Sequence, residues 1–286
     1  AREALHERVL AKHEDDRDRR FAEQDDELPP RVESADDPER RHDALIDLVP
    51  KDPRKIYKMH ELISAVVDEA SFFEIGEKWG RSIITGLARL DGIPVALFAE
   101  NPAIYGGAWT ADACRKLTRL LDLASTFHLP IVHLEDCPGF LIGKKSEEEA
   151  TIRFGSSALA ALGQSNVPFC CVIVRKAFGV AGGANHKPGA HHIRVAWPSG
   201  DWGSLPIEGG IEVAYKAELA EAADYDVHLA KIRDRLNRVR SPFRSAEHFE
   251  IEEIIDPRDT RPVLCRWANL ARRASRAESP SFSYRP

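Results

Sequence analysis

The clearest candidate for chemistry is a glycine-rich segment at residues 179–184 (GVAGGA). Glycines let backbone N–H groups approach a ligand closely, and a helix beginning behind them would favour an anionic oxygen. Ala181 stands where the G-x-G-x-x-G dinucleotide motif needs its second glycine, and Pro188 limits any helix that begins at Gly182. We therefore prefer an oxyanion-binding turn to a nucleotide loop, with a purely structural turn as the alternative. The backbone groups of this turn belong to Gly179, Val180, Ala181 and Gly182.

Other reactive side chains lack the partners that chemistry would need. His186, His191 and His192 lie close in sequence, but no neighbouring Cys, Asp or Glu completes a ligand set, so a solvated loop is favoured and no metal site is predicted. Cys137 follows Asp136, yet no histidine stands in a motif-like relation to it. We expect Cys137 to be a packed thiol.

Strands and helices alternate around these segments. Residues 84–90 and 93–99 flank Asp91-Gly92, which is typical of a type I′ hairpin. Thr110 could cap a helix with one apolar face. The apolar positions of that helix are Ala113, Leu117, Leu120, Leu121, Ala124 and Phe127.

The following segments continue the alternation. Residues 129–134 and 167–174 read as buried strands, and a helix over about 147–162 lies between them. Strand, helix, strand order implies right-handed βαβ crossovers and the α/β class. Two further helical stretches are expected at about 207–223 and 227–240, before a turn at Asp256-Pro257.

Ligands in such folds bind beyond the carboxyl ends of the strands. Three loops are expected there, at residues 100–107, 136–143 and 176–189. The first two supply the candidate substrate-binding residues, which are Asn101, Gly106, Gly107, Asp136, Pro138, Gly139 and Phe140.

Composition narrows the class of protein. The 286 residues are 43% apolar, enough for one large domain or two small ones. A net charge of -6 gives no reason to expect nucleic-acid binding. The five cysteines form no CxxC pair, which favours reduced thiols and a cytoplasmic location. We find no signal peptide and no apolar run approaching the ~18–20 residues of a membrane span.

The first 28 residues differ from the rest. Sixteen of them are Asp, Glu, Lys or Arg, which predicts a charged helical or disordered arm. The chain begins at Ala1, and Met59 is its only methionine. We therefore expect either a processed chain or a piece of a longer protein.

Seven segments, in order, resemble the C-terminal half of the carboxyltransferase (beta) subunit of biotin-dependent acyl-CoA carboxylases of the propionyl-CoA type. The similarity runs over residues 28–272. The segments are the prolines and acids of the lead-in at 28–50, IYKMHELISAVVDEASFFEI (56–75), ITGLARLDGIPVALFAENP (84–102), LPIVHLEDCPGFLIG (129–143), VIVRKAFG (172–179), AWPSGDWGSLPIEGGIEVAYKAEL (196–219) and IIDPRDTR (254–261).

The resemblance implies a crotonase-like spiral of ββα units in a single carboxyltransferase C-terminal domain, here residues 29–272, with a tail at 273–286. It also implies an active site at a dimer interface, where this half receives carboxybiotin and a missing N-domain binds coenzyme A. The implied partners are that N-domain chain, the biotin carboxylase and biotin carrier subunit, and further copies in a homo- or hetero-oligomer. Biotin would be carried on a partner, and an acyl-CoA would be the substrate.

The family's reaction moves a carboxyl group from carboxybiotin to the α-carbon of an acyl-CoA. Two oxyanions develop, on the thioester and on the ureido group, and backbone amides can stabilise them. In the family's mechanism as it is generally drawn, biotin itself can take the α-proton after releasing CO2, so a site without an acid–base pair is no contradiction. The resemblance implies that residues 179–182 form the turn on the biotin side.

The sequence also departs from the family pattern. Ala181 and Gly182-Gly183 change the glycine placement, and Asn185 stands near a common methionine. Residues 204–206 (SLP) replace a Gly-Met-Gly, and Glu149-Ala150 replaces a glycine pair. The alternatives are therefore a decarboxylase or transcarboxylase of the same fold, or a non-catalytic scaffold subunit.

Overall fold

The computed structural model describes residues 28–52, 54–186, 192–203, 211–212, 214–275 and 285. The expected charged arm, most of the tail, His191 and the expected helix start near 207 lie outside the described residues. In the part that is described, no helix is both long and apolar enough to cross a membrane.

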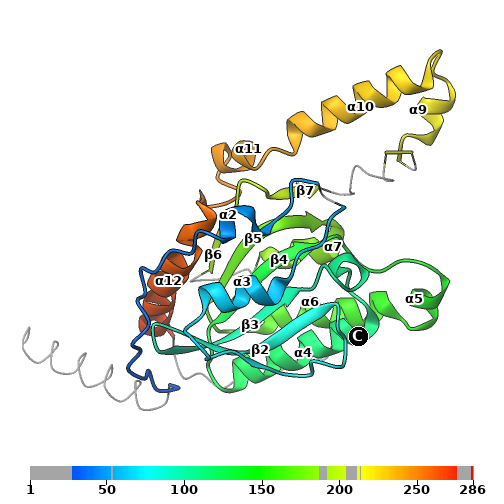
Figure 1. Cartoon of the computed structure of the whole chain (residues 1–286). Coiled ribbons are helices and arrows are strands. Elements are labelled where there is room, and N and C mark those ends of the chain that lie inside the picture. Colours follow the sequence, from blue (N-terminus) through cyan, green and yellow to red (C-terminus); the bar gives the residue numbers. More distant parts are fainter. Residues whose placement is uncertain are drawn as a thin grey trace, which may run out of the picture.

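Within the described residues, an eight-stranded sheet forms the centre of the molecule (Figure 1). The order is β1-β2-β3-β4-β5-β6-β8, and β7 also pairs with β5. The first three strands are antiparallel and the later pairs are parallel. The bounds are β1 Phe73–Glu74, β2 Ile83–Leu90, β3 Ile93–Glu100, β4 Ile131–Cys137, β5 Phe169–Phe178, β6 His192–Ala196, β7 Asp201–Gly203 and β8 Glu253–Ile254. The predicted α/β class is confirmed.

The β2–β3 hairpin forms as its sequence predicts. Asp91 and Gly92 both have positive φ, 52° and 74°, as a type I′ turn requires. The carboxylate of Asp68 accepts their two N–H groups at 3.0 and 2.7 Å. Arg261, in turn, donates to Asp68 at 2.9 Å, so the hairpin is joined to the C-terminal helix.

Helices cover both faces of the sheet (Figure 1). Side chains alternate along each strand, so Val95, Leu97 and Ala99 of β3 pack on one face and Ala96 and Phe98 on the other. The first face packs against α3 (Met59–Val66) and α12 (Thr260–Ala274). The second packs against α4 (Ala111–Thr126) and α6 (Thr151–Gln164).

Two details of the expected helices needed correction. Thr110 caps α4 as predicted, accepting the N–H of Ala113 at 3.1 Å, but Phe127 lies after the helix and is 59% exposed. The helix expected at 147–162 is two helices, α5 (Lys144–Glu148) and α6, because Ala150 adopts a left-handed conformation with φ 58°. That break redirects the chain so that α6 packs beside α4.

The remaining helical elements of the described chain are α2 (Leu45–Leu48), η1 (Tyr105–Gly107), α7 (Gly179–Gly182), η2 (Gly183–Asn185), α9 (Lys216–Ala220), α10 (Tyr225–Val239), α11 (Pro242–Glu247) and η3 (Pro257–Asp259). The predicted charged helix is confirmed as α10.

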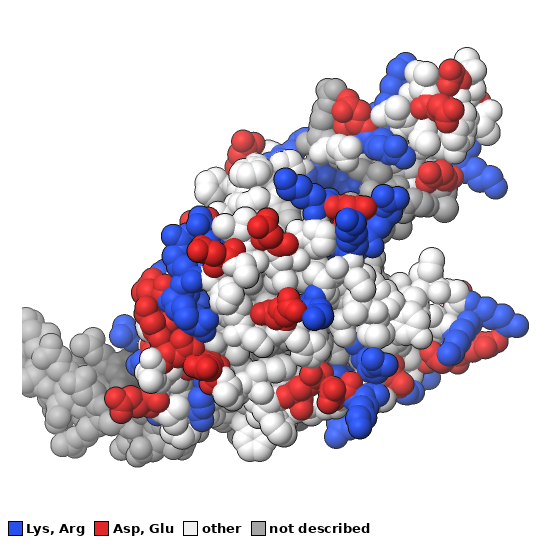
Figure 2. All heavy atoms as spheres, in the orientation of Figure 1, with Lys and Arg blue, Asp and Glu red and all other residues white. Residues whose placement is uncertain are grey.

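Helices α9 and α10 extend away from the sheet (Figure 1). Figure 2 shows acidic and basic side chains interspersed over the visible face of the body and along this extension. Ile211, Leu219 and Ile232 form a small core of their own. Arg240, directly after α10, forms an ion pair with Asp201 of β7. Its guanidinium lies 4.9 Å over the ring of Phe178, so these contacts attach the end of α10 to the sheet.

Candidate functional site

The carboxyl ends of β4, β5 and β6 border a cavity of about 720 Å³. This volume is within the range of about 300–1,000 Å³ that is usual for small-molecule sites. The lining residues are Leu45, Ile46, Val49, Pro50, Lys51, Arg54, Pro138, Arg175, Lys176, Phe178, Trp197, Pro198, Ser199, Asp201 and Pro257. The cavity therefore lies at the strand ends, where the fold class predicts ligands to bind.

The lining combines an apolar surface with cations. Phe178 and Trp197 are almost fully buried and contribute large aromatic surfaces. Two lysines also line the cavity, of which Lys51 is exposed and Lys176 is half-buried. The charge of Arg54 is partly neutralised, because its guanidinium donates to Asp52 at 3.1 Å. An apolar body with an anionic group would suit these walls.

One side of the cavity rests on a buried ion pair. The side chains of Arg175 and Asp136 are 5% and 0% exposed, and Arg175 Nη2 donates to Asp136 Oδ2 at 2.8 Å. Arg175 also donates to the carbonyl of Lys55 at 2.9 Å, which fastens the lead-in segment to β5. Its guanidinium lies 4.9 Å over the ring of Tyr57. Burial and the charge of Asp136 raise the pKa of Tyr57 well above its ordinary value.

A second buried carboxylate, Glu100, lies at the end of β3. It accepts hydrogen bonds from Trp109 Nε1 at 3.0 Å and from the amide of Asp136 at 3.0 Å, and His133 Nε2 lies 3.1 Å from both of its oxygens. Burial alone would raise the pKa of Glu100, but His133 and these hydrogen bonds hold the pKa below its ordinary value. Glu100 thus links the ends of β3 and β4.

The predicted oxyanion turn is the short helix α7. Gly179 begins it with φ 62°, a conformation that favours glycine. The N–H groups of a helix's first turn have no partner within the helix, so residues at its start offer donors. The turn directly follows Phe178, which lines the cavity, while Ala181 and Gly182 are buried against the sheet.

The structure brings several predicted substrate-binding residues together. A Cβ on Gly107 would lie 2.7 Å from the carbonyl oxygen of Asp136 and 3.6 Å from Pro138, so the first two predicted loops meet. Of the seven predicted residues, only Pro138 is among those that line the cavity. Asp136 does not line the cavity itself but holds Arg175, which does.

The remaining predicted residues have local partners. Asn101 accepts the amide of Ala103 at 3.1 Å and donates to Arg81 at 3.3 Å. Gly106 lies in η1 with φ 64° and has open space where a Cβ would be. The carbonyl of Gly139 accepts the amide of Trp109 at 3.0 Å.

Phe140 packs rather than lining the cavity. Its ring meets Trp109 edge to face, with ring centroids 5.8 Å apart. A Cβ on Gly155 of α6 would lie only 2.3 Å from it. Cys137 is fully buried, and burial raises the pKa of its thiol well above the ordinary value, so the prediction of a packed thiol is confirmed.

Sequence reasoning missed part of the lining. Arg175 follows six apolar, buried residues of β5, and a buried arginine needs a partner. That signal could have pointed to it. No local pattern identified residues 45–54 or 197–199, because they meet only when the lead-in crosses the ends of the sheet.

Comparison with known proteins now decides the family. The "Carboxyl transferase domain" family matches residues 19–283. The chain belongs to this family. A carboxyltransferase subunit of propionyl-CoA carboxylase from Haloferax mediterranei is 35% identical over 243 residues, which is 83% of this chain and 46% of the relative. A methylmalonyl-CoA carboxyltransferase 12S subunit from Propionibacterium freudenreichii subsp. shermanii is 32% identical and covers 76% of this chain and 42% of the relative.

A solved structure agrees. A transcarboxylase 12S hexamer with bound methylmalonyl-coenzyme A superposes with a TM-score of 0.81 at 27% identity, over 91% of this chain and 50% of that one. The expected crotonase-like carboxyltransferase fold is thus confirmed. This member of the carboxyl transferase family spans about half the length of the curated relatives that it matches.

Proposed function

We propose that this chain forms the biotin-facing half of a carboxyltransferase that moves a carboxyl group from carboxybiotin to the α-carbon of an acyl-CoA. The observation that carries this proposal is the cavity at the ends of β4, β5 and β6, in a chain of the carboxyl transferase family. An N-domain partner would bind the acyl-CoA, and a carrier subunit would deliver the biotin.

The lining fits the biotin head group. Its sulfur-containing ring is apolar and would pack against Phe178, Trp197 and Pro138. Lys51 and Lys176 offer positive charge for a carboxylate. When bound, carboxybiotin supplies the carboxyl group. Backbone N–H groups at the start of α7 would donate hydrogen bonds to the ureido oxygen, which is the usual way to stabilise developing negative charge.

The chain's own ion pair would hold this surface in place. Arg175 is fixed by Asp136 from β4 and by the carbonyl of Lys55 from the lead-in. It therefore fastens two walls of the cavity to each other. A site held this way needs no reorganisation when charge develops during the reaction.

The test compares the purified chain alone with the chain mixed with a carboxyltransferase N-domain. Carboxyl transfer between biotin and an acyl-CoA should appear only in the mixture. Calorimetry should show weak acyl-CoA binding by the chain alone and tighter binding in the mixture. Tight binding by the isolated chain would contradict the division of labour. A mixture that forms a stable complex without any transfer would favour a scaffold subunit instead.

The similarity to the 12S transcarboxylase makes one alternative worth separating. A transcarboxylase would accept its carboxyl group from one acyl-CoA and pass it to another carboxyl acceptor through biotin. In the mixture, transfer from methylmalonyl-CoA to free biotin would therefore be compared with transfer in the opposite direction.

A further inference from the structure

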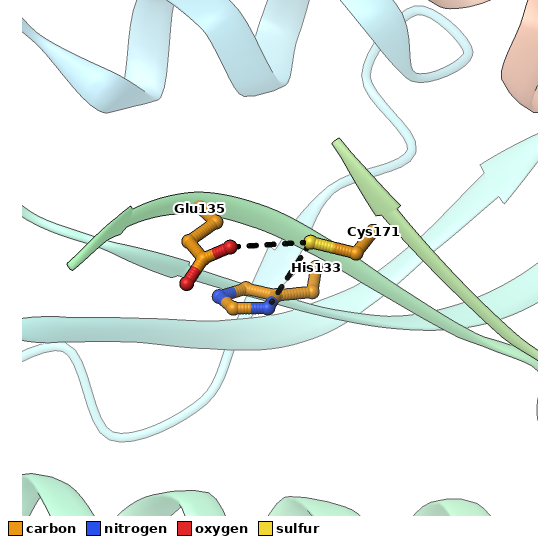
Figure 3. Close-up of side chains that lie close together, drawn as sticks. All are labelled: His133, Glu135 and Cys171. Atoms are coloured by element: carbon orange, nitrogen blue, oxygen red, sulfur yellow. Dashed lines mark hydrogen bonds between the residues drawn. The ribbon is translucent and has the colours of Figure 1, made fainter. Parts of the chain in front are cut away.

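Three side chains that could bind a metal lie close together on two neighbouring strands of the sheet (Figure 3). His133 and Glu135 come from β4 and Cys171 from β5, and all three residues are fully buried. His133 and Cys171 are direct partners in the parallel ladder, and Glu135 is two residues further along the same strand. The strand register therefore turns all three toward the face that α4 and α6 cover.

Their distances suit a tetrahedral ion. Cys171 Sγ lies 3.6 Å from His133 Nδ1 and 3.6 Å from Glu135 Oε2. Zinc binds sulfur at about 2.3 Å and nitrogen or oxygen at about 2.0–2.2 Å, so two such ligands on a tetrahedron lie roughly 3.5 Å apart. All three ligand atoms lie within 4.8 Å of one another, so one ion between them would need the His133 and Glu135 side chains to adjust around Cys171.

The histidine is oriented as metal-binding histidines usually are. Its other nitrogen, Nε2, lies 3.1 Å from both oxygens of Glu100. Glu100 also accepts from Trp109 and the Asp136 amide, so it acts as an acceptor and His133 as the donor. The lone pair of Nδ1 then faces Cys171. A carboxylate that receives the second N–H of a ligating histidine is the common support of zinc sites.

The cluster has fewer hydrogen-bond donors than acceptors, which favours a bound cation. The single S–H of Cys171 lies between two acceptors, His133 Nδ1 and Glu135 Oε2, and can donate to only one of them. A divalent ion would bind all three atoms at once. With the cysteine as thiolate and the glutamate ionised, these two anionic ligands would balance the two positive charges of the ion.

We propose that His133, Glu135 and Cys171 supply three ligands of a buried zinc site, in which a water would complete the tetrahedron. Imidazole with a thiolate and a carboxylate selects zinc over calcium or magnesium, which prefer oxygen ligands. The ion would join β4 to β5 just before the irregular register that begins at Glu135. Glu135 directly precedes Asp136, so the ion would stabilise the two strands that carry the Asp136–Arg175 pair.

The first experiment measures the metal content of the full chain. Protein purified from zinc-supplemented cells should contain one zinc ion per chain, as measured by elemental mass spectrometry. Chain from cobalt-supplemented cells should show the visible bands of tetrahedral cobalt(II) and a thiolate-to-cobalt band in the near ultraviolet. The metal is added during expression, because a fully buried site would exchange metal slowly once the chain has folded.

Neighbouring cysteines provide a matched control. Cys170 and Cys171 are both fully buried, but Cys170 packs on the opposite face of the sheet. Cys171→Ser should lose the thiolate-to-cobalt band and at least tenfold in zinc content, whereas Cys170→Ser should keep both. Glu135→Gln, which preserves the shape of the side chain, should also lose metal. A folded wild-type chain with neither zinc nor a cobalt spectrum would overturn the proposal and leave the carboxyltransferase assignment untouched.

Discussion

Asp136 and Arg175 join the ends of β4 and β5 through an ion pair in which Nε and Nη2 both donate to one carboxylate. The Asp136 side chain also accepts the amide of Lys176 at 3.1 Å. One buried carboxylate therefore fixes the side chain and the backbone of the strand that borders the cavity. Its partner, Arg175, reaches onward to the carbonyl of Lys55 in the lead-in.

Removing one member of this pair should be costly. Asp136→Ala leaves a buried guanidinium without its counter-ion, and we expect the free energy of unfolding to fall by about 3–5 kcal/mol. Urea denaturation measures the change. The control is Glu39→Ala, which breaks the exposed pair with Arg266 and should cost less than about 1 kcal/mol. If both variants lost the same free energy of unfolding, the buried ion pair would contribute no more to stability than the exposed one.

The oxyanion turn can be tested by removing one backbone N–H. Val180 is 69% exposed at the start of α7, where a proline ring is tolerated, and it follows a glycine. Val180→Pro should lower carboxyl transfer by roughly 10²-fold, the scale for losing one oxyanion donor. Val180→Ala keeps the N–H and should stay near wild type. If both variants retain full turnover in the assembled enzyme, this N–H takes no part in the reaction.

Adjacent glycines should respond differently to a side chain. A Cβ on Gly182 would lie 2.4 Å from the carbonyl carbon of Ala177, so even a small side chain there would force the backbone to move. Gly182→Ala should therefore lower the free energy of unfolding by about 1–3 kcal/mol. Gly183 has open space and right-handed φ, so Gly183→Ala should be neutral or stabilising by up to about 1 kcal/mol. Thermal melts of the two variants decide between these outcomes.

Asp36 should make stability depend on acid pH. Burial alone would raise its pKa, but hydrogen bonds from Arg40 and the Glu69 amide, with the charge of Arg261, hold the pKa below its ordinary value of 3.8. A lowered folded-state pKa stabilises the protein above the ordinary value, and this contribution is lost as pH falls through the lowered one.

The comparison uses Asp36→Asn. At neutral pH this variant should be less stable than wild type, and the difference should shrink as the pH falls through the lowered pKa of Asp36. Denaturation curves of both proteins across the acid range give the result. A difference that stays constant with pH would mean that the charge of Asp36 contributes nothing.

The sequence by itself determined the elements that depend on neighbouring residues. Asp91-Gly92 specified the hairpin because its turn requires two positive φ values. Thr110 specified the start of α4 because its hydroxyl accepts an amide three residues on. The order of strands and helices gave the α/β class, and seven motifs in order gave the family.

Only the tertiary structure decided which side chains meet. The left-handed Ala150 divides a helix that periodicity joined, because packing of α6 against α4 outweighs local preference. Arg175 finds Asp136 39 residues away in the chain, and Cys171 meets His133 only through the register of two parallel strands. Such contacts depend on how separate elements pack, and the spacing of residues along the chain carries no direct record of it.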